Sequence, residues 1–138
     1  MGLRSRARLP GRLLASRFAP MSTAQFVYKI ATEAAYASAR GKPGFDGMPI
    51  DAKDGYIHFS TADQLSETLR LHFAGQGGLV LLAVRSADLG QALVWEASRG
   101  GALFPHLYGG PLPAASIAWE APLSVAADGS CVLPEAVR

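Results

Sequence analysis

The pattern of apolar and polar positions along the chain predicts several short strands and few helices. Residues 25–30 alternate polar and apolar side chains with the two-residue period of a half-buried strand. Residues 92–97 are also expected to form a strand, with Leu93 and Trp95 on one side and Val94 and Glu96 on the other. Residues 79–84 are apolar at every position, which is typical of a central strand buried on both faces. Further strands are expected at 55–60, 117–125 and 131–133.

Two helices are expected between these strands. The first begins at the cap Thr32 and runs through about Arg40, and the second covers about 62–74, where apolar residues recur at helical spacing. Gly75 stands where such a helix would end, and residues 41–54 have the glycines, prolines and aspartates of a loop. Because strands outnumber helices without alternating with them, the prediction is an α+β fold with mostly antiparallel pairing.

Two polar clusters stand out against this pattern. Alternation along the strand at 55–60 places Tyr56, His58 and Ser60 on one face, opposite the apolar side that should meet the core. Residues 98–110 contain four glycines and a proline, so we expect a loop that is neither helix nor regular strand. Polar side chains on a loop are a functional hint, and the two clusters together predict one shared pocket.

Composition and charge limit the classes of partner. The 138 residues carry a formal charge of +2, but five arginines and no acid lie in the first twenty positions, which leaves eight basic against eleven acidic residues in the remainder. A mildly acidic body argues against a nucleic-acid surface. No apolar run approaches the length of a membrane span, since the longest, residues 79–84, has six. The single cysteine, Cys131, excludes an internal disulfide and favours a cytoplasmic location.

The domain boundary is expected near residue 23. Residues 1–22 are interpreted as a disordered leader or an overlong gene start, and 23–138 as a single globular domain. The arginine-rich, acid-free beginning also fits a transit peptide, which would imply import into an organelle.

The three histidines have different expected roles. His58 fits either a structural residue bonded to a backbone carbonyl or a general acid/base, and neither is preferred. His106 is expected to be functional because of its loop, whereas His72 is expected to pack at the core boundary on its helix. No two histidines lie three or four residues apart, so no metal is expected.

Arg99, Glu96 and Tyr108 complete the candidate chemistry. The Arg99 guanidinium, next to Gly100 and Gly101, suits a phosphate or a surface ion pair with Glu96. Glu96 stands at a strand end, a usual place for a catalytic carboxylate. Tyr108 would stack on a ligand ring or cover the core.

The combined pattern resembles the family known as domain of unknown function 952. The likeness runs from about Phe26 to Val125. It rests on the segments Tyr28–Ile30, Asp54–Thr61, His72–Phe73, Val94–Glu96 and Phe104–Gly109, with Arg-Gly-Gly between the last two. The resemblance implies an ADP-ribosyltransferase-like fold, in which two small antiparallel sheets are split around an NAD cleft.

Roles follow from that resemblance. His58 would hold the ribose hydroxyls, Tyr56 or Tyr108 would stack on nicotinamide, and His106 with Arg99 would bind the pyrophosphate. The terminal catalytic glutamate of such enzymes has two candidates, Glu96 before the glycine-rich segment and Glu120 beyond it.

The expected function is therefore binding of NAD or a related nucleotide, with cleavage or transfer of ADP-ribose. The alternatives are a non-catalytic module that senses a nucleotide, and a metal-free hydrolase that uses His58 and His106 as acid and base. The oligomeric state is left open. The predicted catalytic residues are His58, Glu96 and His106, and the predicted nucleotide-binding residues are Tyr56, Ser60, Thr61, Arg99, Gly100, Gly101 and Tyr108.

Overall fold

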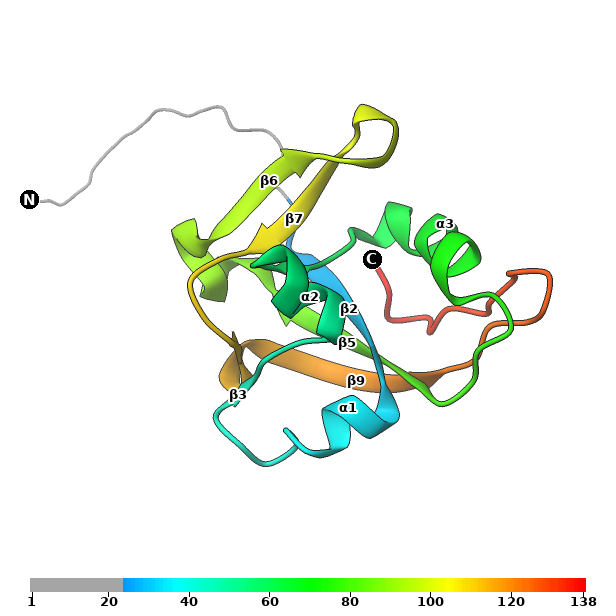
Figure 1. Ribbon diagram of the computed structural model, residues 1–138, viewed down its shortest axis with the longest axis horizontal. Helices are drawn as coiled ribbons and strands as arrows, with labels where there is room; N and C mark the ends of the chain where they lie inside the picture. Colours follow the sequence, from blue (N-terminus) through cyan, green and yellow to red (C-terminus); the bar gives the residue numbers. More distant parts are fainter. Residues whose placement is uncertain (1–23) are drawn as a thin grey trace, which may run out of the picture.

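A three-stranded antiparallel sheet forms the centre of the computed structural model, which describes residues 24–138 (Figure 1). Its strands are β2 (Phe26–Thr32), β5 (Leu79–Arg85) and β9 (Ile117–Leu123), in the order β2-β5-β9. Residues 79–84 of β5 are all buried, as expected for a strand that is apolar on both faces. The predicted central strand is confirmed.

Two smaller antiparallel sheets complete the β-structure. One has the order β4-β7-β6, with β4 at Ile57–His58, β7 at Leu103–Leu107 and β6 at Leu93–Ala97. The other pairs β3 (Gly44–Phe45) with β8 (Leu112–Pro113). The chain is thus α+β with small antiparallel sheets, as predicted.

A backbone bridge ties the second sheet to the first. The Tyr28 N–H donates to the Ser60 carbonyl at 2.8 Å, and the Ser60 N–H donates to the Tyr28 carbonyl at 2.9 Å. In Figure 1 the β6/β7 hairpin lies above the central sheet. The segment that carries His58 is therefore hydrogen-bonded to β2 at Ser60, two residues after the histidine.

The three α-helices are α1 (Glu33–Ala37), α2 (Pro49–Asp54) and α3 (Ala62–Phe73). Thr32 caps α1 as predicted, accepting from the Ala35 N–H at 3.1 Å, but α1 ends at Ala37 rather than near Arg40. The prediction for α3 is confirmed. Gly75 follows it with φ of 79°, a left-handed conformation that glycine adopts without strain. Short 3₁₀ turns occupy Ser86–Ala92, Arg99–Gly101 and Ala114–Ser116.

Three expectations are wrong, and for β3 and β7 the reason is pairing with strands distant in sequence. The interval 41–54 is not all loop: it contains β3, and α2 starts with Pro49, a residue preorganised for a first helical turn. The interval 98–110 contains β7, which pairs with strands on both sides, and the carbonyl of Pro105 accepts from the Phe59 N–H at 3.0 Å. Residues 131–133 form no strand.

The core has two parts, one on each face of the central sheet. Leu65 and Leu69 of α3 pack with one face. Ile57, Phe59 and Leu107, from β4, the residue after it and β7, pack with the other. As a result, α3 and β4 lie on opposite sides of the edge strand β2. Among residues 24–138, no helix is both long and apolar enough to cross a membrane.

Candidate functional site

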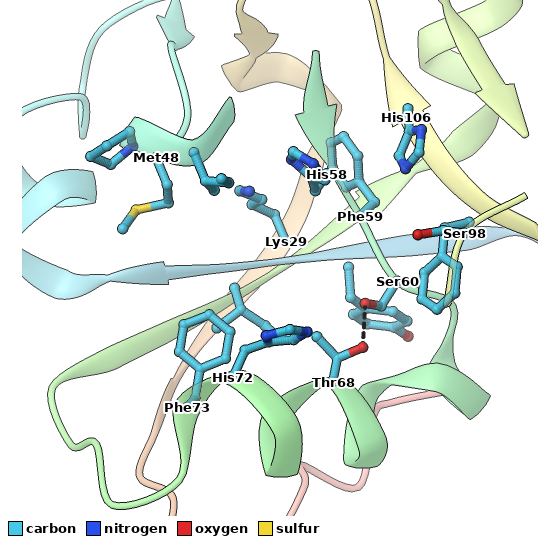
Figure 2. Close-up of a pocket in the computed structure, with 15 residues that line it drawn as sticks. Lys29, Met48, His58, Phe59, Ser60, Thr68, His72, Phe73, Ser98 and His106 are labelled. Carbon is cyan, nitrogen blue, oxygen red and sulfur yellow. Dashed lines mark hydrogen bonds between the residues drawn. The ribbon is translucent and has the colours of Figure 1, made fainter. Parts of the chain in front are cut away.

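A cavity of about 530 Å³ lies along β2, between α3 on one side and α2 with β4 on the other (Figure 2). Three consecutive residues of β2, Tyr28 to Ile30, line it. A volume of this size falls within the range of small-molecule sites. The polar side chains on its wall are Lys29, His58, Ser60, Thr68, His72, Ser98 and His106, and the apolar ones include Met48, Pro49, Ile50, Phe59, Phe73 and Phe104.

His58 reaches the cavity because its neighbours are buried. Ile57 and Phe59 are 4% and 3% exposed, so the strand alternation turns the imidazole to the other face, as predicted. Its Nδ1 lies 2.6 Å from Asp51 Oδ1 and its Nε2 lies 2.9 Å from Asp54 Oδ2. The partners of His58 are thus carboxylates, whereas the structural alternative assumed a backbone carbonyl. An imidazole with a proton on each nitrogen can donate to both carboxylates at once.

Asp51 is the centre of a buried polar group that the sequence analysis missed. Its Oδ2 accepts from the Met48 N–H at 2.6 Å and lies 2.7 Å from Lys29 Nζ, while Oδ1 accepts from the His58 N–H at 3.0 Å. Burial by itself would raise the pKa of Asp51, but the hydrogen bond from His58 and the Lys29 charge lower it to about 2. Burial lowers the pKa of Lys29, although the Asp51 carboxylate acts against this. Asp51 and Lys29 are 2% and 3% exposed, so each buried charge is stabilised by the opposite charge beside it.

His106 lies directly opposite His58 in the β4–β7 pair, on a strand rather than on the predicted loop. It is 5% exposed, and its Nδ1 lies 2.7 Å from Glu96 Oε1 on β6. Because Glu96 occupies Nδ1, Nε2 is the ring nitrogen left to meet a ligand in the cavity. The two imidazole rings are 5.4 Å apart. The structure therefore brings two carboxylate-bound histidines to one wall.

Tyr56 and Tyr108 cluster around these histidines instead of facing the cavity. Tyr56 stacks on His106 with ring centroids 4.2 Å apart, and the Tyr108 hydroxyl donates to Glu96 Oε1 at 2.7 Å. Hydrogen bonds from His106 and Tyr108 lower the pKa of Glu96, and the bond to Glu96 raises the pKa of Tyr108 to about 12. Neither tyrosine ring lines the cavity.

The remaining predicted nucleotide-binding residues divide between the cavity and other places. Ser60 lines the cavity and donates to Thr68 Oγ1 at 3.3 Å. Thr61 caps α3 and does not line the cavity. Gly100 and Gly101 form the turn between β6 and β7, away from the cavity wall. The side chain of Arg99 lies outside the described residues.

Two residues with expected roles remain to be placed, His72 and Glu120. His72 is exposed and lines the cavity, so its expected packing at the core boundary is not found. Glu120, on the central sheet, pairs with Arg40 at 2.7 Å and does not line the cavity, which leaves Glu96 as the glutamate next to the histidines.

Of the missed residues, Asp51 had a weak signal in its position after Pro49 at a helix start. Lys29 had a weak signal too, because it stands within an apolar strand. Among residues 24–138, no group of three or more His, Cys, Asp or Glu side chains is placed to hold a metal ion.

Comparison with known proteins identifies the family. Residues 30–120 match the family described as "Protein of unknown function (DUF952)". The chain belongs to this family. The crystal structure of protein CC0527 from Caulobacter crescentus is 46% identical, with a TM-score of 0.72 over 78% of this chain and 93% of that one. The solution NMR structure of CC0527 is also 46% identical, with a TM-score of 0.67 over 77% and 90% of the two chains. No protein of curated function matches the chain.

Proposed function

We propose that the cavity of this DUF952 chain binds a nucleotide of the NAD or ADP-ribose type, and that the chain cleaves off or transfers the ADP-ribosyl group. The observation that carries the proposal is the pair of imidazoles, His58 and His106, each bonded to a carboxylate on the wall of a 530 Å³ cavity. An imidazole that a carboxylate holds at one nitrogen, as Glu96 holds His106, can bind a hydroxyl and move a proton through the other nitrogen.

The fold offers a second line of support. Two three-stranded antiparallel sheets meet at the Tyr28–Ser60 bridge, and the cavity lies beside that junction. A pair of small split sheets with a cleft between them is the arrangement that the resemblance to ADP-ribosyltransferase-like proteins implies. Fold likeness alone does not assign an activity, so the proposal depends on the side chains.

The proposed reaction breaks the bond between ribose C1′ and the ring nitrogen of nicotinamide. The electron pair of that bond leaves with nicotinamide, and an oxygen of water or of an acceptor hydroxyl bonds to C1′. His106 Nε2 takes the proton from this oxygen, because Glu96 already holds Nδ1. Positive charge develops on the ribose in such a reaction, and the Glu96 and Asp54 carboxylates stabilise it electrostatically. Ser60 faces the cavity as a partner for the ribose hydroxyls, and His58 would join it by exchanging its Nε2 bond to Asp54 for a bond to a hydroxyl.

Each of the two alternative functions, the hydrolase and the sensing module, is favoured by an observation of its own. The 5.4 Å between the imidazoles suits an acid and a base in a metal-free hydrolase acting on another ester or glycoside. The occupation of both His58 nitrogens by Asp51 and Asp54 suits a module that binds a nucleotide without reacting with it.

Binding and nicotinamide release together test the proposal. NAD or ADP-ribose at a hundredfold over its dissociation constant should stabilise the fold by about 2.7 kcal/mol, which a thermal-melting assay detects. Nicotinamide release is then compared between wild type and the His58→Ala, His106→Ala and Glu96→Ala variants. Glu120→Ala is the matched control, since both glutamate side chains are 39% exposed but Glu120 lies elsewhere.

The outcomes separate the three functions. Loss of release in the site variants but not in Glu120→Ala supports the proposed enzyme. Nucleotide binding with no release in any variant would leave the sensing module. No thermal shift with any nucleotide would exclude both and favour the hydrolase.

A further inference from the structure

Lys29 has more hydrogen-bond donors than the surrounding protein satisfies. Its side chain is 4% exposed, and an ammonium group carries three N–H donors. Within residues 24–138, the acceptor found for Nζ is Asp51 Oδ2 at 2.7 Å. Since Lys29 lines the cavity, a ligand there can accept from its remaining donors. Buried polar groups in folded proteins almost always have partners, so a ligand atom is the natural one here.

The charge around Lys29 selects the kind of acceptor. Asp51 already balances the ammonium and is itself 2% exposed, so a second anion bound to Nζ would lie close to the Asp51 carboxylate. Two carboxylates or a carboxylate and a phosphate at one buried site repel each other. An uncharged carbonyl oxygen accepts the hydrogen bond without this cost.

The walls of the cavity near Lys29 select the body of the ligand. Figure 2 shows Met48 and Lys29 on one side of β2, and His72 and Phe73, from α3, on its other side. Met48 and Pro49 come from the start of α2, and Phe73 from the end of α3. A thioether and an aromatic ring on opposite walls form favourable contacts with a flat aromatic group.

We infer that Lys29 Nζ binds an uncharged carbonyl oxygen carried on a flat ring, with the ring between Met48 and Phe73. The inference rests on the proposed function and names the part of the ligand that this end of the cavity recognises: an aromatic carboxamide such as the nicotinamide group. The ribose would then extend toward His58 and His106.

The first test needs no variant and uses four pyridines that differ at one position. Nicotinamide and 3-acetylpyridine carry an uncharged carbonyl, nicotinate carries a carboxylate, and 3-methylpyridine carries no oxygen. Dissociation constants are measured by titration of the labelled wild-type protein in NMR. The amide and the ketone should bind about tenfold to a hundredfold more tightly than the methyl compound, the range expected for a hydrogen bond to a charged donor.

The second test removes the donor. Lys29→Met alone would leave Asp51 as a buried uncompensated charge and risks unfolding, so the Lys29→Met/Asp51→Asn double variant is used beside it. The double variant should bind all four pyridines with nearly equal affinity. Lys42→Met, at an exposed lysine, is the matched control and should keep the preference for the carbonyl compounds.

Each result decides the inference. Equal binding of nicotinamide and 3-methylpyridine to wild type would mean that buried water serves Lys29, and would overturn it. Tighter binding of nicotinate would overturn it in favour of an anion site. If NAD still shifts the melting temperature in either case, the proposed function stands while the carbonyl site fails. If neither NAD nor any pyridine binds, both fail.

Discussion

Replacing Asp51 with Asn removes the charge at the centre of the buried polar group while keeping the size of the side chain. In the wild-type protein four donors converge on the Asp51 carboxylate: the Met48 N–H at 2.6 Å, the His58 N–H at 3.0 Å, His58 Nδ1 at 2.6 Å and Lys29 Nζ at 2.7 Å. An asparagine has one carbonyl oxygen for these donors, and its NH₂ group would face donors in place of the second oxygen. The Lys29 ammonium would also lose its counter-charge.

The expected loss is large compared with the stability of a small domain. Removing one partner of a buried ion pair typically costs 3–5 kcal/mol, out of the 5–15 kcal/mol that most domains possess. The pKa of Asp51 gives an independent figure: a decrease from 3.8 to about 2 on folding corresponds to about 2–3 kcal/mol. The two figures overlap near 3 kcal/mol, so we expect Asp51→Asn to lower the free energy of unfolding by about that amount at neutral pH.

The sign of the pH dependence follows from the same pKa. Because the folded-state pKa lies below the unfolded one, the carboxylate stabilises the fold fully above about pH 4. This stabilisation is lost as the pH falls toward 2. The difference in stability between wild type and Asp51→Asn should therefore narrow over that interval.

Urea unfolding followed by tryptophan fluorescence measures both effects, at neutral pH and then in steps down to about pH 2. Asp46→Asn, at an exposed aspartate, is the matched control and should unfold like wild type. The Lys29→Met/Asp51→Asn double variant should lose less stability than Asp51→Asn alone, because it leaves no buried unpaired charge. An Asp51→Asn protein within about 0.5 kcal/mol of wild type, the usual range for surface substitutions, would refute the reasoning.

Three further predictions concern the residues around His106 and the end of α2. In Glu96→Gln the pKa of Tyr108 should fall from about 12 toward the ordinary value near 10, because the bonded carboxylate is gone; an unchanged titration of the tyrosine in NMR would contradict this. Tyr56→Leu removes the ring stacked 4.2 Å from His106, so thermal unfolding should show a loss of about 0.5–1.5 kcal/mol beyond the change in buried area. Gly55→Ala should cost about 1–2 kcal/mol, since φ there is 86° and no neighbour lies near the added Cβ; a neutral effect would mean that the backbone relaxes.

Local sequence was enough for much of the frame. The strand β2, the helix α3 and the orientation of His58 follow from periodicities of two or about 3.6 residues, and β5 follows from an unbroken apolar run. Neighbouring residues set these patterns by themselves. Alternation turned Ile57 and Phe59 into the core, so His58 had to face the other way.

What the tertiary structure alone decided involves partners that are far apart in the sequence. β7 contains Pro105 and follows a glycine-rich turn, yet it is a strand because β4 and β6 supply its hydrogen bonds on both sides. Like β7, the Lys29–Asp51 pair is not predicted by the local sequence. Each charge is tolerated in the interior only because the other is 2.7 Å away. Periodicity thus determines which way a side chain points, and long-range packing determines what it meets there.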